Sequence, residues 1–372
     1  MSDVSSPVVF VAGARPNFMK VAPMLRAMTA AAPPFARVLV HTGQHYDAAM
    51  SDVFFRELGM PSPDVHLNAG SGSHGAQTAK VLASFEEYLL GCAARPRGVV
   101  VVGDVNSTMA CALAAVKLSI PVAHVEAGLR SFDRTMPEEI NRLVTDAICD
   151  LLLTSERAGD ANLAREGIPA ERVRFVGNVM IDTLMHQLPA AKALGVAASM
   201  GLAPQGYALV TLHRPSNVDE PVRLAALVGL LEKVAARRAV VFPTHPRTRE
   251  RLERFGLLER LRSNGAIHLR DALGYRENLG LMADAALVLT DSGGIQEETT
   301  ALGVPCLTLR SNTERPATVT DGTNTLVGDD LDAAWARVLE VLEGRYKKGA
   351  TVEGWDGHAA ERVTRVLLDA WG

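Results

Sequence analysis

Short runs of apolar residues alternate with segments of helical periodicity along the whole chain. In the first half, the apolar runs are bounded by glycine, proline or polar residues and have the length of strands buried on both faces of a parallel sheet. These runs are Val8–Ala12, Val38–His41, Gly98–Val102, Val122–Val125 and Leu151–Thr154. Between them, apolar residues recur with the helical period in Met19–Met28, Thr78–Leu90 and Thr108–Lys117. The alternation predicts an open parallel sheet covered by helices.

The same alternation begins again in the second half of the chain. Its apolar runs are Ala208–Leu212, Ala239–Phe242, Ala286–Leu289 and Cys306–Leu309. Between the two halves, an alanine-rich stretch from Gly177 to Gly206 is interrupted by proline and glycine and contains no clear strand. We therefore predict two Rossmann-like, doubly wound α/β domains. Residues 1–182 form the first, residues 183–356 form the second, and a final helix over residues 357–372 packs back on the first.

Length and composition agree with this organisation and limit the choice of ligand. A chain of 372 residues fits two domains, because single cores stop growing at about 250 residues. Hydrophobic residues make up 48% and charged residues 22%, which is typical of a globular protein. The net charge of −4 argues against a broad cationic surface for nucleic acid or an acidic membrane. An anionic ligand is therefore expected to be small.

Cysteine spacing and hydropathy indicate a reduced, cytoplasmic protein. Cys92, Cys111, Cys149 and Cys306 form no Cys-x-x-Cys pair, so neither a zinc site nor a disulfide framework is expected. The segment Met1–Pro7 carries no basic region followed by a long apolar one. No apolar run approaches the roughly 18 residues of a membrane span. We expect buried thiols and no contact with a membrane.

Polar residues follow most of the apolar runs, at the carboxyl ends where open α/β sheets bind ligands. Arg15 and Lys20 follow the first run, where a helix N-terminus favours an anion, although a turn with two solvated cations is an equally good interpretation. Gln44 and His45 follow the second run, and alone would be interpreted as surface residues of a turn. Asp104 follows the third run and is either a functional carboxylate or a helix cap.

Two further carboxylates extend this pattern. Glu126 ends a strand whose other residues are apolar, so its charge needs a cation or a chemical role. Glu138 and Glu139 open a helix after Pro137, where the helix dipole alone favours acids, so one of them is expected to be structural. The other would join Asp104 and Glu126 in one crevice. Mutual repulsion between such carboxylates can tune a base towards neutral pH.

The second half carries the residues expected of a phosphate site. His213 and His245 end two strands of one sheet, which favours a site over two structural histidines. The next strand ends in Ser292, Gly293 and Gly294, at the start of a helix whose free N–H groups suit a phosphate.

One turn into that helix, Glu298 can reach a ribose. Arg315 follows the next strand and has bidentate reach to a diphosphate. A diphosphate site in one domain and carboxylates in the other indicate a nucleotide-sugar enzyme with its active site in the cleft between the domains.

Taken in order, seven motifs closely resemble those of the non-hydrolysing UDP-N-acetylglucosamine 2-epimerases. The motifs are Gly13–Pro23, Thr42–His45, His124–Arg130, Pro137–Arg142, Thr211–Arg214, Asp291–Glu298 and Thr313–Pro316. The resemblance covers nearly the whole chain. It implies a glycosyltransferase-B-type fold, a UDP-sugar as the binding partner and a homodimer, which is common in the family.

The resemblance also implies an isomerase that interconverts UDP-N-acetylglucosamine and UDP-N-acetylmannosamine for cell-surface polysaccharide precursors. In that family a base removes the C2 proton, UDP leaves to give a 2-acetamidoglucal, and UDP adds back with the proton on the opposite face, without a metal or other cofactor. By motif, the catalytic residues are Asp104, Glu126, Glu138 and His213. The substrate-binding residues implied in the same way are Arg15, Lys20, Gln44, His45, Arg142, Ser292, Gly293, Gly294, Glu298 and Arg315.

Two departures from the family pattern leave alternatives open. Val102 stands where many members have histidine, and the segment His213–Asn217 lacks a glutamate that many members carry. Many bacterial members bind a second UDP-N-acetylglucosamine near that segment as an activator, so this regulation is open here. UDP-glucose and UDP-2,3-diacetamido-glucuronate remain alternative substrates, and a hydrolysing epimerase is an alternative activity. A catalytically inactive sensor would be expected to have lost the carboxylates.

Overall fold

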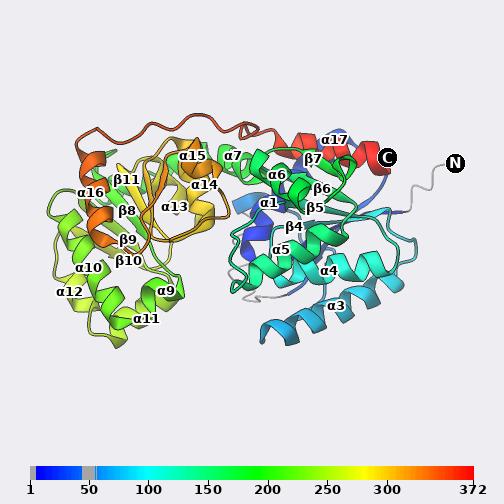
Figure 1. Cartoon of the computed structure of the whole chain (residues 1–372), viewed down its shortest axis with the longest axis horizontal. Coiled ribbons are helices and arrows are strands. Elements are labelled where there is room, and N and C mark those ends of the chain that lie inside the picture. The colour runs from blue at the N-terminus through cyan, green and yellow to red at the C-terminus, as the bar shows by residue number, and fades with distance from the viewer. Residues whose placement is uncertain (1–5, 44–54, 56) are drawn as a thin grey trace. The chain divides into compact units, whose positions relative to one another are not determined.

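The computed structural model describes residues 6–43, 55 and 57–372, apart from the side chain of Arg15. The chain divides into two compact units, residues 1–183 with 353–372 and residues 184–352. Each unit contains one parallel sheet with helices on it, and is called a domain below (Figure 1).

The first domain is built on a seven-stranded sheet in the order β3-β2-β1-β4-β5-β6-β7. Its strands are β1 (Val8–Ala12), β2 (Arg37–His41), β3 (Val65–His66), β4 (Gly98–Val102), β5 (Val122–Ala127), β6 (Leu151–Thr154) and β7 (Val173–Phe175). Its helices are α1 (Arg15–Ala31), α3 (His74–Leu90), α4 (Asn106–Lys117), α5 (Pro137–Ile148), α6 (Arg157–Arg165), the 3-10 helix η1 (Ala170–Arg172), the first part of α7 (Val179–Ala193) and α17 (Ala359–Trp371). The strand order reverses between β1 and β4, and doubly wound sheets bind ligands beyond the carboxyl ends of the strands at such a reversal.

The core of this domain explains the continuous apolar runs in its sequence. Strands β1 and β4 are buried along their whole length, because helices cover both faces of the sheet. Val9 and Val99 on these strands share one buried core with Phe85 of α3 and Cys111 of α4. Strands β1 and β4 therefore lie in the packed core of the domain, which holds the turns at their carboxyl ends in place.

Helix α17 completes the first domain, as shown in red in Figure 1. It buries Val363, Leu367 and Trp371 on one face at the helical spacing. The Trp371 ring lies so close to Gly98 that a Cβ there would approach it to 2.5 Å. Asp182 of α7 accepts hydrogen bonds from the first two amides of α17, at 3.2 and 2.8 Å. The helix is thus fixed at both ends to the first domain.

The second domain has a six-stranded sheet in the order β10-β9-β8-β11-β12-β13, which reverses between β8 and β11. Its strands are β8 (Tyr207–Thr211), β9 (Ala239–Pro243), β10 (Ile267–Arg270), β11 (Leu287–Thr290), β12 (Cys306–Thr308) and β13 (Asn324–Leu326). Its helices, besides the rest of α7, are α8 (Val196–Ser199), α9 (Pro215–Val218), α10 (Pro221–Ala235), α11 (Pro246–Arg254), α12 (Leu258–Arg262), α13 (Tyr275–Ala283), α14 (Gly293–Leu302), α15 (Ala317–Thr320) and α16 (Leu331–Leu342).

The predicted fold class of two doubly wound α/β domains is confirmed, and each predicted strand is present. The strands that the sequence pattern missed, β3, β7, β10 and β13, are the edge strands of the two sheets. They are short and partly exposed, so they lack a continuous apolar run. None of the helices in the described part of the chain combines the length and the apolar character that crossing a bilayer requires.

Candidate active site

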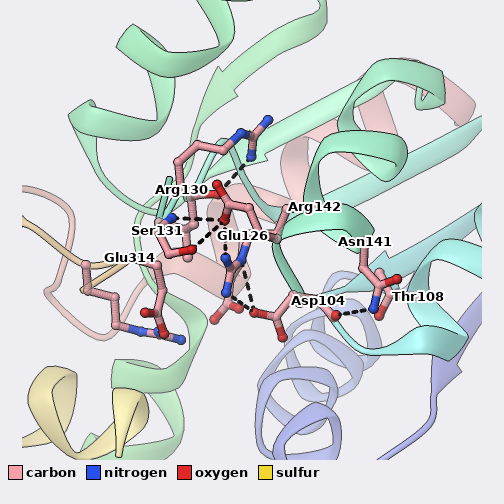
Figure 2. A network of polar contacts seen from close by, with 12 residues as sticks. Asp104, Thr108, Glu126, Arg130, Ser131, Asn141, Arg142 and Glu314 are labelled. Atoms are coloured by element: carbon pink, nitrogen blue, oxygen red, sulfur yellow. Dashed lines mark hydrogen bonds and ion pairs between the residues drawn. The ribbon is translucent and has the colours of Figure 1, made fainter. Parts of the chain in front are cut away.

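Asp104 lies in the turn after β4, two residues beyond the end of the strand, and is oriented by helix α5 (Figure 2). Arg142 donates from Nε and Nη2 to Asp104 Oδ2, at 3.1 and 2.7 Å. Asn141 donates to the main-chain oxygen of Asp104 at 2.9 Å. The Asp104 side chain is 28% exposed, whereas that of Arg142 is buried. The alternative interpretation of Asp104 as a helix cap is wrong, because Val105 occupies the cap position of α4.

Glu126 is held in a strained and buried position at the end of β5. Its φ is +70°, and the register between β5 and β6 shifts between Val125 and Ala127. Glu126 Oε2 pairs with Lys20 of α1, whereas Oε1 is buried without a hydrogen-bond partner among the described residues. The backbone strain costs about 1–3 kcal/mol and the unsatisfied oxygen a similar amount. Costs of this kind concentrate at functional sites.

The two glutamates that open α5 have different environments. Glu139 is buried and accepts hydrogen bonds from the Ser131 amide and hydroxyl, at 2.9 and 3.0 Å, and from the Phe132 amide at 2.9 Å. It also pairs with Arg142, so it is the structural one of the two. Glu138 is half-buried, and no hydrogen bond or ion pair of its carboxylate occurs within the described residues.

The first domain thus brings part of the predicted site together. Lys20 pairs with Glu126, and Arg142 pairs with Asp104. A Cβ on Gly103, the neighbour of Asp104, would lie 3.6 Å from Glu126 Oε2, so the two carboxylates belong to adjacent turns. Three other predictions concern Arg15, Gln44 and His45. Gln44 and His45 lie outside the described residues, as does the side chain of Arg15 at the first position of α1.

In the second domain, His213 follows β8 and is oriented by Asp291, which follows β11. Asp291 is fully buried and lies 3.0 Å from His213 Nδ1. It also accepts hydrogen bonds from the His213 and Arg214 amides and from Asn217. Burial raises the pKa of Asp291, but these hydrogen bonds and the charge of His213 outweigh it and hold the pKa below its ordinary value. An ionised Asp291 fixes a proton on His213 Nδ1 and leaves Nε2 for a ligand.

The N-terminus of α14 carries the residues that the sequence predicts to bind a phosphate. Ser292 is the cap residue and its amide donates to Thr290 Oγ1 at 3.0 Å. A Cβ on Gly293 would lie 2.6 Å from Arg315 Nη1, whereas one on Gly294 would meet nothing within 4 Å. A side chain at position 293 would therefore displace the Arg315 guanidinium, whereas space does not require glycine at position 294.

Buried charges surround this helix terminus. Arg315 pairs with Glu297 at 2.9 Å and with Glu314. Glu298 accepts a hydrogen bond from the Tyr275 hydroxyl at 2.9 Å. Burial raises the pKa of Glu298 to about 7, opposed by that hydrogen bond. Within the described ranges, no group of three or more His, Cys, Asp or Glu residues is arranged to hold a metal ion.

Sequence reasoning assigned no role to several residues that shape the site. Asp291 lies within one of the family motifs, but its partners His213 and Arg214 are far from it in the sequence, so the motif alone gives it no role. Arg310 was missed, although it follows the apolar run Cys306–Leu309 and could have been noticed for that reason. It is buried and donates to Glu314 at 2.9 Å. Tyr275, the partner of Glu298, carried no signal in the sequence.

Comparison with known proteins decides the family. Residues 27–368 match the family model described as UDP-N-acetylglucosamine 2-epimerase. The chain belongs to this epimerase family. It is thus an isomerase, and the predicted family is confirmed.

Individual epimerases resemble the chain along its whole length. The UDP-N-acetylglucosamine 2-epimerase of Methanocaldococcus jannaschii is 43% identical over 362 residues, which are 96% of this chain and 97% of the relative. The UDP-2,3-diacetamido-2,3-dideoxy-D-glucuronate 2-epimerase of Pseudomonas aeruginosa is 41% identical over 369 residues, 97% and 99% of the two chains.

Solved structures of the family share the fold. The crystal structure of the Methanocaldococcus jannaschii UDP-GlcNAc 2-epimerase in complex with UDP-GlcNAc and UDP has a TM-score of 0.87 to this chain, at 42% identity. The similarity covers 97% of this chain and 99% of the other. The epimerase family has a glycosyltransferase-B-like fold, so this prediction is confirmed as well.

Proposed function

We propose that this epimerase interconverts UDP-N-acetylglucosamine and UDP-N-acetylmannosamine without hydrolysis. The observation that carries the proposal is the full-length match to UDP-N-acetylglucosamine 2-epimerases. The carboxylates Asp104 and Glu126, in adjacent turns at the carboxyl edge of one sheet, support it. We further propose a cytoplasmic homodimer that supplies precursors for cell-surface polysaccharides.

The proposed reaction is an elimination followed by an addition. A carboxylate takes the C2 proton, the electrons of the C2–H bond form a C1=C2 double bond, and the C1–O bond breaks with its electrons on the departing UDP. Addition of the UDP oxygen to C1 and of a proton to the opposite face of C2 gives the epimer. Asp104, Glu126 and Glu138 are the proposed proton-transfer groups. Each such group typically contributes about 10²–10⁴-fold to the rate.

The second domain is proposed to hold the UDP. The Ser292–Gly294 segment offers the N–H groups of α14 to the diphosphate, and Arg315 adds its cation. His213, with its proton on Nδ1 fixed by Asp291, presents Nε2 to the leaving diphosphate. Glu298 is proposed to accept hydrogen bonds from the ribose. From the first domain, Arg15, Lys20, Gln44, His45 and Arg142 are proposed to bind the rest of the substrate or to support the carboxylates.

The substitution Glu298→Gln is expected to stabilise the protein above neutral pH and to weaken UDP binding. The pKa of Glu298 in the folded protein is about 7, above its ordinary 4.5, so its ionisation opposes folding. This cost is absent below pH 4.5, grows as the pH rises and is complete above pH 7, where it reaches about 3 kcal/mol. Denaturant unfolding of both proteins at pH 5 and pH 8, with calorimetric titration of UDP, measures the two effects.

The exposed Glu253 of α11 provides a matched control, because Glu253→Gln should change neither quantity. Equal stability of Glu298→Gln and the unsubstituted protein at pH 8 would contradict the expectation for Glu298.

A second candidate substrate is a UDP-2,3-diacetamido-glucuronate. It is favoured by the 41% identity to the Pseudomonas aeruginosa enzyme that is named for that sugar. The two candidates differ at C3 and C6 and not at the reacting C2, so the same proton-transfer groups serve either one.

Incubation with each UDP-sugar in deuterated water tests the proposal. With the true substrate, proton NMR should show deuterium at C2 of both epimers, and phosphorus NMR should show no accumulation of free UDP. Release of UDP in step with turnover would indicate a hydrolysing epimerase instead. The absence of C2 exchange with UDP-N-acetylglucosamine, UDP-glucose and the diacetamido-glucuronate would refute the proposed function.

A further inference from the structure

A buried histidine and aspartate connect the turns that carry two of the candidate catalytic carboxylates. The side chains of His124 and Asp146 are 0% and 1% exposed. His124 Nε2 lies 2.8 Å from the main-chain oxygen of Gly103, which precedes Asp104. Asp146 accepts a hydrogen bond from the Gly128 amide at 3.0 Å, two residues after Glu126. The pair thus contacts both turns at once.

The hydrogen-bond partners determine where the protons of this pair lie. A main-chain oxygen only accepts hydrogen bonds, so His124 Nε2 must carry a proton. Asp146 Oδ1 lies 2.6 Å from His124 Nδ1, while Asp146 Oδ2 faces the Gly128 amide and the Arg130 guanidinium, at 3.0 and 2.7 Å. Two donors on Oδ2 favour the ionised carboxylate, which only accepts, so Nδ1 must donate as well.

The charges around His124 and Asp146 are balanced when both ring nitrogens of His124 are protonated and Asp146 is ionised. Burial raises the pKa of Asp146, but the charge and hydrogen bond of His124, the charge of Arg130 and the Gly128 amide outweigh it and hold the pKa below its ordinary value. Arg130 is in turn neutralised by Glu166, to which Nε and Nη2 donate at 2.8 and 2.7 Å. Two cations therefore alternate with two carboxylates, and of these four side chains only that of Glu166 is partly exposed.

We propose that His124 is a positioning residue for epimerisation, an imidazolium held by Asp146 that fixes the turns of Asp104 and Glu126 relative to each other. This proposal rests on the proposed function in one respect, because the reaction that His124 would serve is the proposed epimerisation. Glu126 has the strained φ of +70°, and such a conformation persists only where its surroundings determine it. His124 two residues before it and Gly128 two residues after it are both bonded to Asp146.

The two ring protons can be observed without any turnover. Nitrogen-15 NMR of histidine-labelled protein is expected to show both His124 nitrogens protonated at pH 7.5, with the signal assigned by its loss in His124→Gln. A bare ring nitrogen at pH 7.5 would overturn the proposal. Since this measurement needs no substrate, its outcome is independent of whether the proposed function holds.

Kinetics then separates positioning from simple structural support. His124→Gln is expected to lower kcat by up to about 100-fold, because a small misplacement of a catalytic group can cost that much. The KM and the affinity for UDP should change less than about threefold, because UDP is bound by the other domain. His268→Gln, the same change on the edge strand β10, is the matched control and should leave kcat unchanged. An unchanged kcat in His124→Gln would overturn the proposal.

If His124→Gln does not fold, the variant Asp146→Asn provides a second test of the proposal. The new amide can donate to a bare Nδ1, so the ring is expected to become neutral while Nε2 still donates to Gly103. The fall in kcat should therefore be smaller than for His124→Gln. A ring that stays doubly protonated in Asp146→Asn would show that Asp146 does not hold the charge and would overturn the proposal.

Discussion

Replacement of Asp104 by asparagine is expected to lower kcat by about 10²–10⁴-fold and to leave UDP binding unchanged. The amide has the shape of the carboxylate, and its oxygen can still accept the hydrogen bonds from Arg142. The turn after β4 should therefore keep its conformation, while the side chain can no longer take up a proton. Epimerisation followed by proton NMR and calorimetric titration of UDP measure the two quantities.

The exposed Asp369 of α17 offers a matched control in the same domain, since Asp369→Asn makes the same chemical change away from the site. Asp104→Asn with the turnover of the unsubstituted enzyme would remove Asp104 from the proposed mechanism. A loss of UDP affinity together with turnover would instead indicate that the substitution disturbs binding.

The substitution Glu126→Gln is expected to reduce both turnover and stability. The side chains of Lys20 and Glu126 are 7% and 3% exposed, so the neutral amide leaves a buried ammonium without its counter-charge. Removal of one partner of a buried ion pair costs about 3–5 kcal/mol of unfolding free energy. We expect kcat to fall by about 10²–10⁴-fold as well, because Glu126 is a proposed proton-transfer group. Urea unfolding and NMR-monitored epimerisation measure these losses.

The double variant Lys20→Met/Glu126→Gln distinguishes the two effects. Removal of both charges abolishes the unpaired ammonium, so most of the lost stability should return, while turnover should stay low. A double variant that is as active as the unsubstituted enzyme would show that Glu126 serves only as a counter-charge for Lys20.

The sequence predicted the interior of both sheets and missed their margins. Strands such as β1 and β4 are buried on both faces and therefore appear as uninterrupted apolar runs. Edge strands β7 and β10 are only three and four residues long and each includes an exposed residue, so they are too short for a periodic signal. In the interior of a sheet, strand propensity and burial favour the same apolar residues. An edge strand depends instead on pairing with the one strand beside it.

The site was predictable where its residues follow strands, and unpredictable where they act through distant partners. Asp104 and His213 each lie two residues beyond the end of a strand, β4 and β8, so sheet topology alone indicates them. The residues that orient them, Arg142 and Asp291, lie 38 and 78 positions away in the chain, so spacing does not indicate them, and only the family resemblance named Arg142. The positive φ of Glu126 likewise could not be predicted from the residue type, because glutamate does not favour this conformation. Such features arise from tertiary contacts.

The return of α17 to the first domain sets the order in which the domains can be completed on the ribosome. The second domain is continuous over residues 184–352, whereas the first also requires residues 353–372. Domains usually fold in the order of synthesis, from the N-terminus. Here the domain that begins first must finish last, with the apolar surface that Leu367 and Trp371 cover left open until they emerge. The half that carries Asp104 and Glu126 therefore stays incomplete until residues 353–372 have been synthesised, after all of residues 184–352.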